Sequence, residues 1–219
     1  MRIRGKAKVP ALLQQADDWI HQEAAGMIHI DKERYTAACL EVGCGKGIFL
    51  SQLAEQNPDK LYIGVDKFVE IIARAAMQSA SRQLPNVRVS MIDVERIETI
   101  LAPTSIQTIY LNFSDPWPRR KNEKRRLTYP RFLDIYARIL APNGWLEMKT
   151  DNAELFAWSL QSFAKAGWTV SEAERALAST APQGMEHEAR YVKTEYETRF
   201  RGLGVPICYL QARPPALLS

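Results

Sequence analysis

The sequence predicts an α/β protein whose core is a doubly wound, mostly parallel sheet with helices on both faces. Short apolar runs typical of buried strands alternate with helical patterns along most of the 219 residues. Turns rich in Pro, Asn and Gly separate these runs. Acidic residues stand at or near the ends of successive strand-like runs, where ligands bind in sheets of this kind.

In the first half of the chain, predicted strands and helices follow one another in strict order. Residues 38–42 form a short apolar run, and a glycine-rich turn leads from it into a helical pattern over 48–56. The next strand is expected over 61–65 and the next helix over 68–84, where apolar residues recur at helical spacing. A Pro-Asn turn then precedes a strand over 87–92. This alternation predicts parallel neighbours joined by right-handed crossovers.

The second half continues the pattern. A fourth strand over 108–113 runs into a proline-rich turn, and a helix is expected over 131–140. A Pro-Asn-Gly turn precedes a fifth strand over 145–149. The pair Thr150-Asp151 is expected to cap a helix over 153–166, and the glycine that follows is expected to end it.

Two closing strands, over 192–200 and 207–212, bring the expected sheet to seven strands. The chain carries no internal repeat and no low-complexity tract. We therefore expect one domain over residues 36–219, preceded by a basic N-terminal extension over 1–35.

The composition is typical of a globular protein, with 46% hydrophobic and 25% charged residues. No apolar run reaches membrane-spanning length, and the N-terminus lacks the apolar segment of a secretory signal. Three cysteines without zinc-type spacing predict reduced thiols in a cytoplasmic protein, and scattered histidines argue against a metal site. These residues are Cys39, Cys44, Cys208, His21, His29 and His187.

The net charge of +4 is unevenly distributed. Residues 1–8 hold four basic side chains and no acid, and residues 119–126 hold six basic side chains and one acid. Elsewhere acidic side chains outnumber basic ones. Positive charge confined to two short segments is typical of a surface that binds phosphates.

A glycine-rich loop follows the first strand and opens a helix. It reads Glu41-Val-Gly43-Cys-Gly45-Lys-Gly47, where glycines permit positive φ and close approach of a ligand to the backbone. The loop departs from the dinucleotide pattern G-x-G-x-x-G, because its third glycine comes one residue early. The acid at position 41 is poorly placed for a pyrophosphate and suits the cationic amino acid end of S-adenosyl-L-methionine.

Two later acids fit the same ligand. Asp66 ends the second strand, nineteen residues after Gly47, where a carboxylate could accept hydrogen bonds from ribose hydroxyls. Asp93 ends the third strand and could bind the adenine amino group. This pattern resembles that of the class I methyltransferases. A nicotinamide-dependent dehydrogenase is the alternative if the glycine loop is misread.

The most informative segment follows the fourth strand. It places Asp115, Pro116, Trp117 and Pro118 in one turn. A rigid acid and a flat aromatic ring beside a basic run predict a site that handles a nucleobase carried on a polyanion. The basic run comprises Arg119, Arg120, Lys121, Lys124, Arg125 and Arg126. Taken alone, the run could also be a solvated surface segment.

Residues 112–127 resemble the signature of bacterial tRNA (guanine-N7)-methyltransferases of the TrmB type. The glycine loop, Lys149-Thr150-Asp151 after the fifth strand and the tetrad Thr194-Glu195-Tyr196-Glu197 also match. The resemblance extends from about residue 38 to residue 201. It implies the class I methyltransferase fold, S-adenosyl-L-methionine as cofactor, tRNA as substrate and N7 of the variable-loop guanosine at tRNA position 46 as methyl acceptor.

The resemblance also implies a role for individual residues. Asp115 is implied to be catalytic. The cofactor is implied to contact Glu41, Gly43, Gly45, Asp66, Asp93 and Asp115. The substrate guanosine is implied to contact Arg119, Asp151, Thr194, Glu195, Tyr196 and Glu197. RNA phosphates are expected to contact Arg120, Lys121, Lys124, Arg125 and Arg126.

Two departures from the family pattern are Ser114 in place of the usual proline and Arg119 in place of the usual lysine. Two alternatives stay open from the sequence. One is a methyltransferase acting on a small molecule or a protein, which would not need the basic run. The other is an RNA-binding protein without catalytic activity, which would not need the intact glycine loop. The sequence leaves the choice between monomer and homodimer open, and we hypothesise that residues 1–35 stay mobile until RNA docks.

Overall fold

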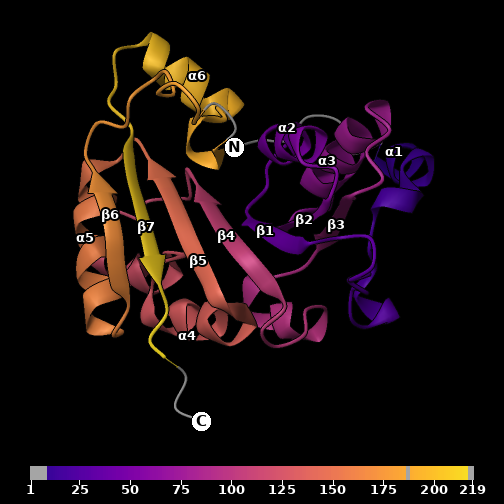
Figure 1. The fold of residues 1–219 in the computed structure, drawn as a ribbon, viewed down its shortest axis with the longest axis horizontal. Helices are drawn as coiled ribbons and strands as arrows, with labels where there is room; N and C mark the ends of the chain where they lie inside the picture. The colour runs from indigo at the N-terminus through magenta and orange to yellow at the C-terminus, as the bar shows by residue number, and fades with distance from the viewer. Residues whose placement is uncertain (1–8, 186–187, 217–219) are drawn as a thin grey trace. The chain divides into compact units, whose positions relative to one another are not determined.

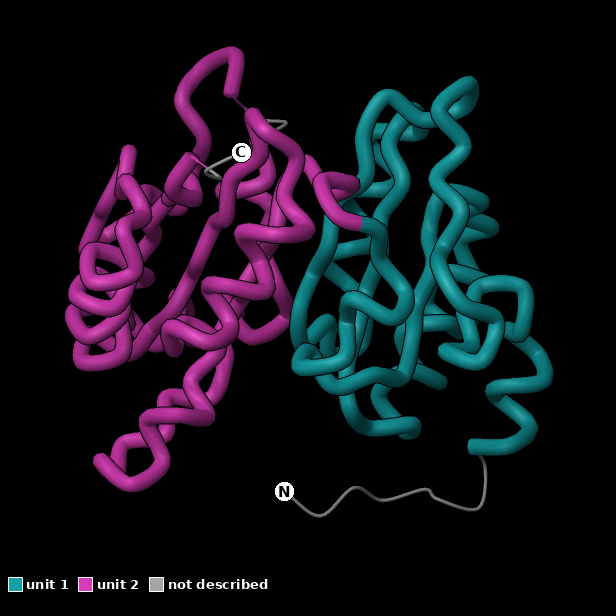
Figure 2. The backbone as a smooth tube through the Cα atoms, turned by 90° about the horizontal axis from the view of Figure 1, so that it is seen from below, with its two compact units in different colours: residues 1–102 teal, residues 103–219 magenta. Residues whose placement is uncertain are grey.

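The computed structural model describes residues 9–185 and 188–216. The chain divides into two compact units, one ending at Ala102 and the other beginning at Pro103 (Figure 2). Each unit contains both helices and strands. Over the described residues the strands number seven, as predicted.

The first unit contains three parallel strands in the order β3-β2-β1 (Figure 1). The strands are β1 (Ala37–Val42), β2 (Lys60–Asp66) and β3 (Val87–Met91). Helices α2 (Ile48–Gln56) and α3 (Val69–Ser81) supply the crossovers, and the 3-10 helix η4 (Val94–Thr99) follows β3. Strands β1 and β2 are almost entirely buried, which explains their continuous apolar sequences.

The segment before β1 packs on this first unit. Its elements are α1 (Val9–Gln15), which lies against α3, and the short helices η2 (Asp17–Trp19) and η3 (Glu23–Ala25). The His21 N–H donates to Val89 O at 2.8 Å, and the Ile28 N–H donates to Ile100 O at 2.8 Å. The basic residues 1–8 lie outside the described residues. A boundary between an N-terminal extension and a catalytic domain near residue 35 stays a prediction.

The second unit contains four strands in the order β4-β5-β7-β6. They are β4 (Ile106–Asn112), β5 (Leu140–Thr150), β6 (Thr169–Glu174) and β7 (Cys208–Arg213). Strands β4 and β5 are parallel, and β7 runs antiparallel to both β5 and β6. The helices are α4 (Pro130–Ile139), α5 (Ala153–Lys165) and α6 (Glu195–Gly202), with 3-10 turns η5 (Arg120–Arg125) and η6 (Ala189–Tyr191).

Helix α4 shows how the sequence covers this sheet. Its buried residues include Phe132, Leu133, Tyr136 and Ile139, which share one helical face, while the charged residues of the helix point to solvent. Each large apolar side chain buried in this way stabilises the fold by about 1.5–3 kcal/mol. Helices α4 and α5 pack against each other on one side of the strands (Figure 1).

Most predicted elements are confirmed, but two expectations are wrong and one strand was missed. The expected strand over 192–200 is the helix α6 and the turn before it. The seventh strand is instead β6, which was not predicted from the sequence because its exposed, polar residues lack an apolar face. Helix α5 is capped by Asn152, whose side chain accepts from the Leu155 N–H at 2.7 Å, and not by the preceding aspartate.

A buried asparagine joins several elements of the first unit. The Asn86 side-chain amide donates to Ala54 O at 2.9 Å, to Asn57 O at 3.1 Å and to Lys60 O at 3.0 Å. These carbonyls belong to the end of α2, the following turn and the start of β2. Because Asn86 is only 2% exposed, water cannot replace these bonds.

We expect Asn86→Ala to lower the free energy of unfolding by about 2–3 kcal/mol, since it leaves buried carbonyls without a donor. Asn86→Asp should lower it at least as much, because a carboxylate of the same shape repels the same carbonyls. Urea denaturation of both variants measures the effect, with exposed Gln56→Ala as the control. Equal stability of all three variants would contradict this role.

Candidate functional site

The glycine loop between β1 and α2 presents its backbone to solvent. Gly43 has φ +76° and Gly45 has φ +55°, and a Cβ atom at either position would meet no atom within 4 Å. Gly47 is different, because a Cβ there would lie 3.0 Å from the Cα of Ala75 in helix α3. The first two glycines therefore leave room for a ligand beside the backbone, and the third allows close packing of two helices.

The acids predicted from the sequence lie along the carboxyl ends of the parallel strands. Glu41 is 2% exposed, directly before the glycine loop. Asp66 ends β2 and its carboxylate accepts from the Phe68 N–H at 3.1 Å. Asp93 follows β3 and its carboxylate accepts from the Glu95 N–H at 3.1 Å. The backbone thus fixes the orientation of both aspartates.

The negative charges of two of these acids act on a residue of the glycine loop. Burial raises the pKa of the Cys44 thiol well above its usual value, and the negative charges of Glu41 and Asp66 raise it further. Such a thiol stays protonated at neutral pH. This buried thiol therefore serves as a packing residue of the loop.

The carboxylates and the open backbone of the glycine loop fit the cofactor that the sequence predicts. A buried carboxylate beside open backbone can hold an ammonium group and exclude a phosphate. A carboxylate at the end of the neighbouring strand can accept hydrogen bonds from ribose hydroxyls. The residues predicted to bind it lie at the carboxyl ends of the parallel strands β1, β2 and β3 or directly after them; these are Glu41, Gly43, Gly45, Asp66 and Asp93.

In the second unit, Asp115 lies in a turn with unusual backbone geometry. Phe113 has φ +53° and Trp117 has φ +43°, so a non-glycine residue in the left-handed region stands two positions on either side of the acid. Each such residue costs roughly 1–3 kcal/mol, which the surrounding structure must supply. Asp115 itself is exposed. The start of the turn is fixed by the Phe113 N–H, which donates to Lys149 O at 2.8 Å.

An aromatic group stands beside this turn. The ring of Tyr196 lies 5.1 Å from that of Phe113 and stacks at 4.3 Å on that of Phe200, measured between centroids. Burial raises the pKa of the Tyr196 phenol, and the negative charges of Asp151 and Asp115 also raise it, whereas Arg199 lowers it. Both predicted acids therefore act on the same tyrosine. Tyr196 is nevertheless 44% exposed, so one side of it faces solvent.

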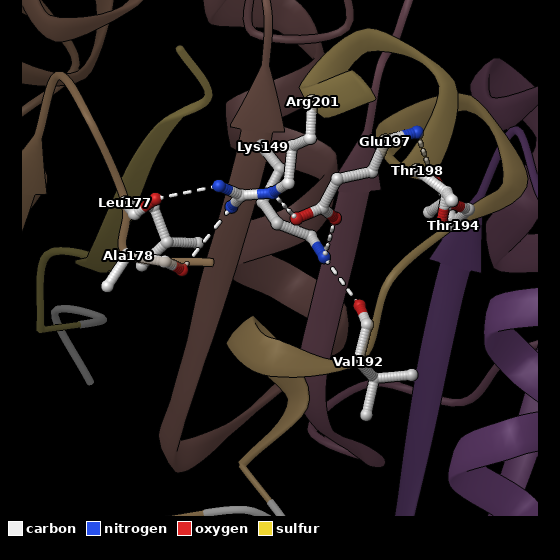
Figure 3. Close-up of polar contacts among 8 residues, drawn as sticks. All are labelled: Lys149, Leu177, Ala178, Val192, Thr194, Glu197, Thr198 and Arg201. Carbon is white, nitrogen blue, oxygen red and sulfur yellow. Dashed lines mark hydrogen bonds and ion pairs between the residues drawn. The ribbon is translucent and has the colours of Figure 1, made fainter. Parts of the chain in front are cut away.

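Helix α6 is held on the sheet by a buried ionic cluster (Figure 3). The Glu197 carboxylate receives Lys149 Nζ at 2.8 Å on one oxygen and Arg201 Nε at 2.8 Å on the other. Lys149 Nζ also donates to Val192 O at 2.7 Å. The Lys149 and Glu197 side chains are 3% and 1% exposed. The cluster joins β5 to α6 and to the segment that precedes it.

The tetrad at residues 194–197 is a helix cap. Thr194 is the N-cap of α6, and its hydroxyl accepts from the Glu197 N–H at 2.9 Å. The pattern T-x-x-E at this spacing is a helix-start signal, although its alternation also resembles a strand. The Glu197 carboxylate is buried and bonded to Lys149 and Arg201, and its predicted contact with the substrate guanosine stays a prediction. Thr194, Glu195 and Tyr196 remain accessible at the N-terminus of the helix.

The basic run forms the turn η5, with Arg119 as its N-cap. Its exposed cations are Arg119, Arg120, Lys121, Lys124 and Arg125. Arg125 lies over the Trp117 ring at 4.9 Å. Arg126 does not fit its predicted role as a phosphate contact, because its side chain is buried. Lys149, Arg201, Phe113 and Phe200 support the site and were assigned no role from the sequence.

Two observations apply to the described part of the chain alone. Within residues 9–185 and 188–216, no group of three or more His, Cys, Asp or Glu side chains is placed to hold a metal ion. None of the helices found there has both the length and the apolar character needed to cross a bilayer.

Comparison with known proteins adds independent information. A family model described as "Putative methyltransferase" matches residues 35–210. A tRNA (guanine-N(7)-)-methyltransferase of Bacillus velezensis is 41% identical over 168 residues, which are 77% of this chain and 75% of that protein. The Lachnoclostridium phytofermentans protein of the same name is 35% identical over 218 residues, covering 97% of this chain and 98% of its own.

Solved structures agree on the fold. The 16S rRNA methyltransferase KamB matches with a TM-score of 0.63 and 16% identity, covering 98% of this chain and 96% of its own. A 16S rRNA (adenine(1408)-N(1))-methyltransferase, crystallised with its cosubstrate SAM, matches with a TM-score of 0.60 and 14% identity over 88% of this chain and 95% of its own. The predicted class I methyltransferase fold is therefore confirmed.

We expect Lys149→Met to lower the free energy of unfolding by about 3 kcal/mol, because it removes one partner of a buried carboxylate. The double variant Lys149→Met, Glu197→Leu should recover much of this loss, since no acid then stays buried without its lysine. Urea denaturation provides the measurement, with exposed Lys165→Met as the control. A Lys149 variant as stable as the control would show that the cluster does not hold α6.

Proposed function

Because this chain belongs to the family of tRNA (guanine-N(7)-)-methyltransferases, we propose that it methylates N7 of a guanosine in tRNA, with S-adenosyl-L-methionine as methyl donor. One observation carries the proposal. An exposed acid, Asp115, is held in a strained turn between an aromatic group and a run of exposed cations. A base carried on a polyanion needs these three features together.

The first unit would hold the cofactor. Glu41 would bind the ammonium of the methionine moiety while the backbone at Gly43 and Gly45 lies alongside it. Asp66 would accept from the ribose hydroxyls, and Asp93 would accept from the adenine amino group. The bound cofactor supplies a methyl group on a sulfonium, which is already a good leaving group.

The reaction needs no general base. N7 of guanine carries a lone pair and no proton, so it can attack the methyl carbon directly. The task of the protein is to hold the reacting atoms in line, about 3 Å apart. Positive charge develops on the guanine ring in the transition state. Asp115 would stabilise that charge electrostatically and orient the base, without removing a proton.

The N-terminus of α6 would recognise the base. The exposed face of Tyr196 offers a stacking surface for a purine, supported from behind by Phe113 and Phe200. Asp151 and the side chains of Thr194 and Glu195 could accept from guanine N1–H and from its exocyclic amine. Adenine offers no N1–H, so these acceptors would favour guanine.

The exposed cations of η5 would bind tRNA phosphates. Arg119, the N-cap of this turn, would contact the guanosine, while Arg120, Lys121, Lys124 and Arg125 would contact the phosphates of the RNA backbone. Within folded tRNA the target base must be drawn out of its stack. We assign the methylation to position 46 of the variable loop, and we place the reaction in the cytoplasm, where free thiols such as Cys39, Cys44 and Cys208 stay reduced.

The proposal is tested by incubating the protein with methyl-labelled cofactor and unmodified tRNA, followed by digestion to nucleosides. Label is expected in 7-methylguanosine, and a tRNA with adenosine at position 46 should accept none. Label in another nucleoside would overturn the assignment of the reaction. Label in 7-methylguanosine from the position-46 variant would overturn only the assigned position.

We expect Asp115→Asn to lower kcat about a hundredfold and to leave the Kd of the cofactor within about tenfold, because the charge acts mainly in the transition state. Single-turnover methylation and calorimetric titration with the cofactor measure the two quantities. Asp134→Asn, on the exposed face of α4, is the control. Normal turnover of the Asp115 variant would contradict its catalytic role.

We expect the triple variant Arg120→Ala, Lys121→Ala, Lys124→Ala to raise KM for tRNA and to leave kcat nearly unchanged. The slope of log Kd against log salt should become shallower by about 0.7–0.9 for each phosphate that the variant no longer neutralises. Filter binding at several salt concentrations measures this slope. An unchanged slope would mean that η5 is only a solvated surface.

A further inference from the structure

Arg126 ends the basic run, but its side chain does not face solvent. It is 7% exposed. Its guanidinium donates from Nε to Pro116 O at 3.0 Å and from Nη2 to Trp117 O at 3.2 Å. The bonded residues are ten and nine positions earlier in the chain. Arg126 therefore ties the turn that follows Asp115 to the far end of η5.

Helix α5 holds Arg126 in turn. The guanidinium carbon lies 4.5 Å from the ring centroid of Trp158, which stacks on Tyr129 with centroids 6.3 Å apart. The backbone two residues after Arg126 is anchored on the same helix, because the Ser162 hydroxyl donates to Thr128 O at 2.7 Å. Helix α5 thus packs directly against the guanidinium that binds the turn.

The turn needs such support. Phe113 and Trp117 both occupy the left-handed region, and Asp115 between them is exposed and gains nothing from burial. The Phe113 N–H fixes the start of the turn on Lys149 O, and Arg126 fixes its end. We infer that Arg126 is a positioning residue that holds Asp115 in its reactive orientation, an inference that rests on the proposed function, and that it contacts no phosphate.

The shape of the arginine side chain separates these two roles. A planar guanidinium can bind two carbonyls while stacking on an indole ring, and an ammonium cannot do all of this at once. A phosphate contact, in contrast, tolerates lysine because it depends mainly on charge. Arg126→Lys therefore keeps the positive charge but loses the ability to bind both carbonyls while stacking on the Trp158 ring.

We expect Arg126→Lys to lower kcat about tenfold or more, because small displacements of a catalytic group are costly. KM for tRNA and the slope of log Kd against log salt should stay unchanged. Trp158→Leu should show the same pattern, although it removes no cation. The matched control for kcat is Arg138→Lys, at an exposed arginine of α4 that has no role in the site and should keep kcat. The control for a phosphate contact is Arg125→Ala, which should make the salt slope shallower by about 0.7–0.9.

Three results would overturn the inference. One is an Arg126→Lys variant with the kcat of the unsubstituted protein. Another is an Arg126→Ala variant that keeps kcat while its salt slope becomes shallower. The third is a folded Trp158→Leu variant with full kcat. Far-ultraviolet circular dichroism and thermal denaturation of each variant identify any that fail to fold.

A measurement without substrate separates this inference from the proposed function. The backbone amides of Phe113, Ser114, Asp115 and Trp117 should exchange with deuterium several-fold faster in Arg126→Lys than in the control Arg138→Lys. Equal exchange would overturn the positioning role even if methylation is confirmed. If exchange is faster but the protein forms no 7-methylguanosine, Arg126 still holds the turn, and the proposed function is wrong.

Discussion

The position of helix α6 in the second unit depends on the burial of one carboxylate, that of Glu197. Helix α6 has eight residues, and Glu197 is the buried one among them. The helix therefore buries no apolar side chain completely, although the Tyr196 ring contacts that of Phe113. Taking a carboxylate out of water costs several kcal/mol, and only close cations can offset this cost. Lys149 and Arg201 supply them from the sheet and from the last turn of the helix, so the placement of Thr194 and Tyr196 follows from a charge interaction.

Burial distinguishes the acids that bind a cation inside the protein from the acids that a substrate can reach. Glu41 and Glu197 are buried, at 2% and 1% exposure, and each is suited to binding a cation. Asp93 and Asp115 are exposed, and their orientation comes from the backbone around them. For Asp93 this is ordinary helix capping. For Asp115 it is a strained turn, and backbone strain of this kind clusters at functional sites.

The sequence predicted strands and helices well wherever burial dictates apolar periodicity. It located α2 from Ile48 to Gln56 and the acids at the strand ends, because β1, β2 and β3 are parallel and buried. It failed where apolar content is low. Strand β6 is half exposed, and α6 is polar, so neither has a hydrophobic pattern to read. The capping pattern at Thr194 was the available signal, and strand-like alternation obscured it. Pairing over long sequence distances, as between Lys149 and Glu197, leaves no local signal at all.

The basic run shows that a count of cations in a sequence can exceed the number exposed on the surface. Six cations between residues 119 and 126 predict six potential phosphate contacts if they are counted alike. The 3-10 turn η5 ends at Arg125, and the backbone becomes extended at Arg126, which directs that side chain inward to the carbonyls of Pro116 and Trp117. The exposed cations of η5 and the arginine that binds the Asp115 turn thus lie on adjacent residues of one segment. Under the proposed function, the cations that would dock RNA are covalently joined to the residue that would hold the catalytic turn, so tRNA would be bound within a few residues of the group that acts on its base.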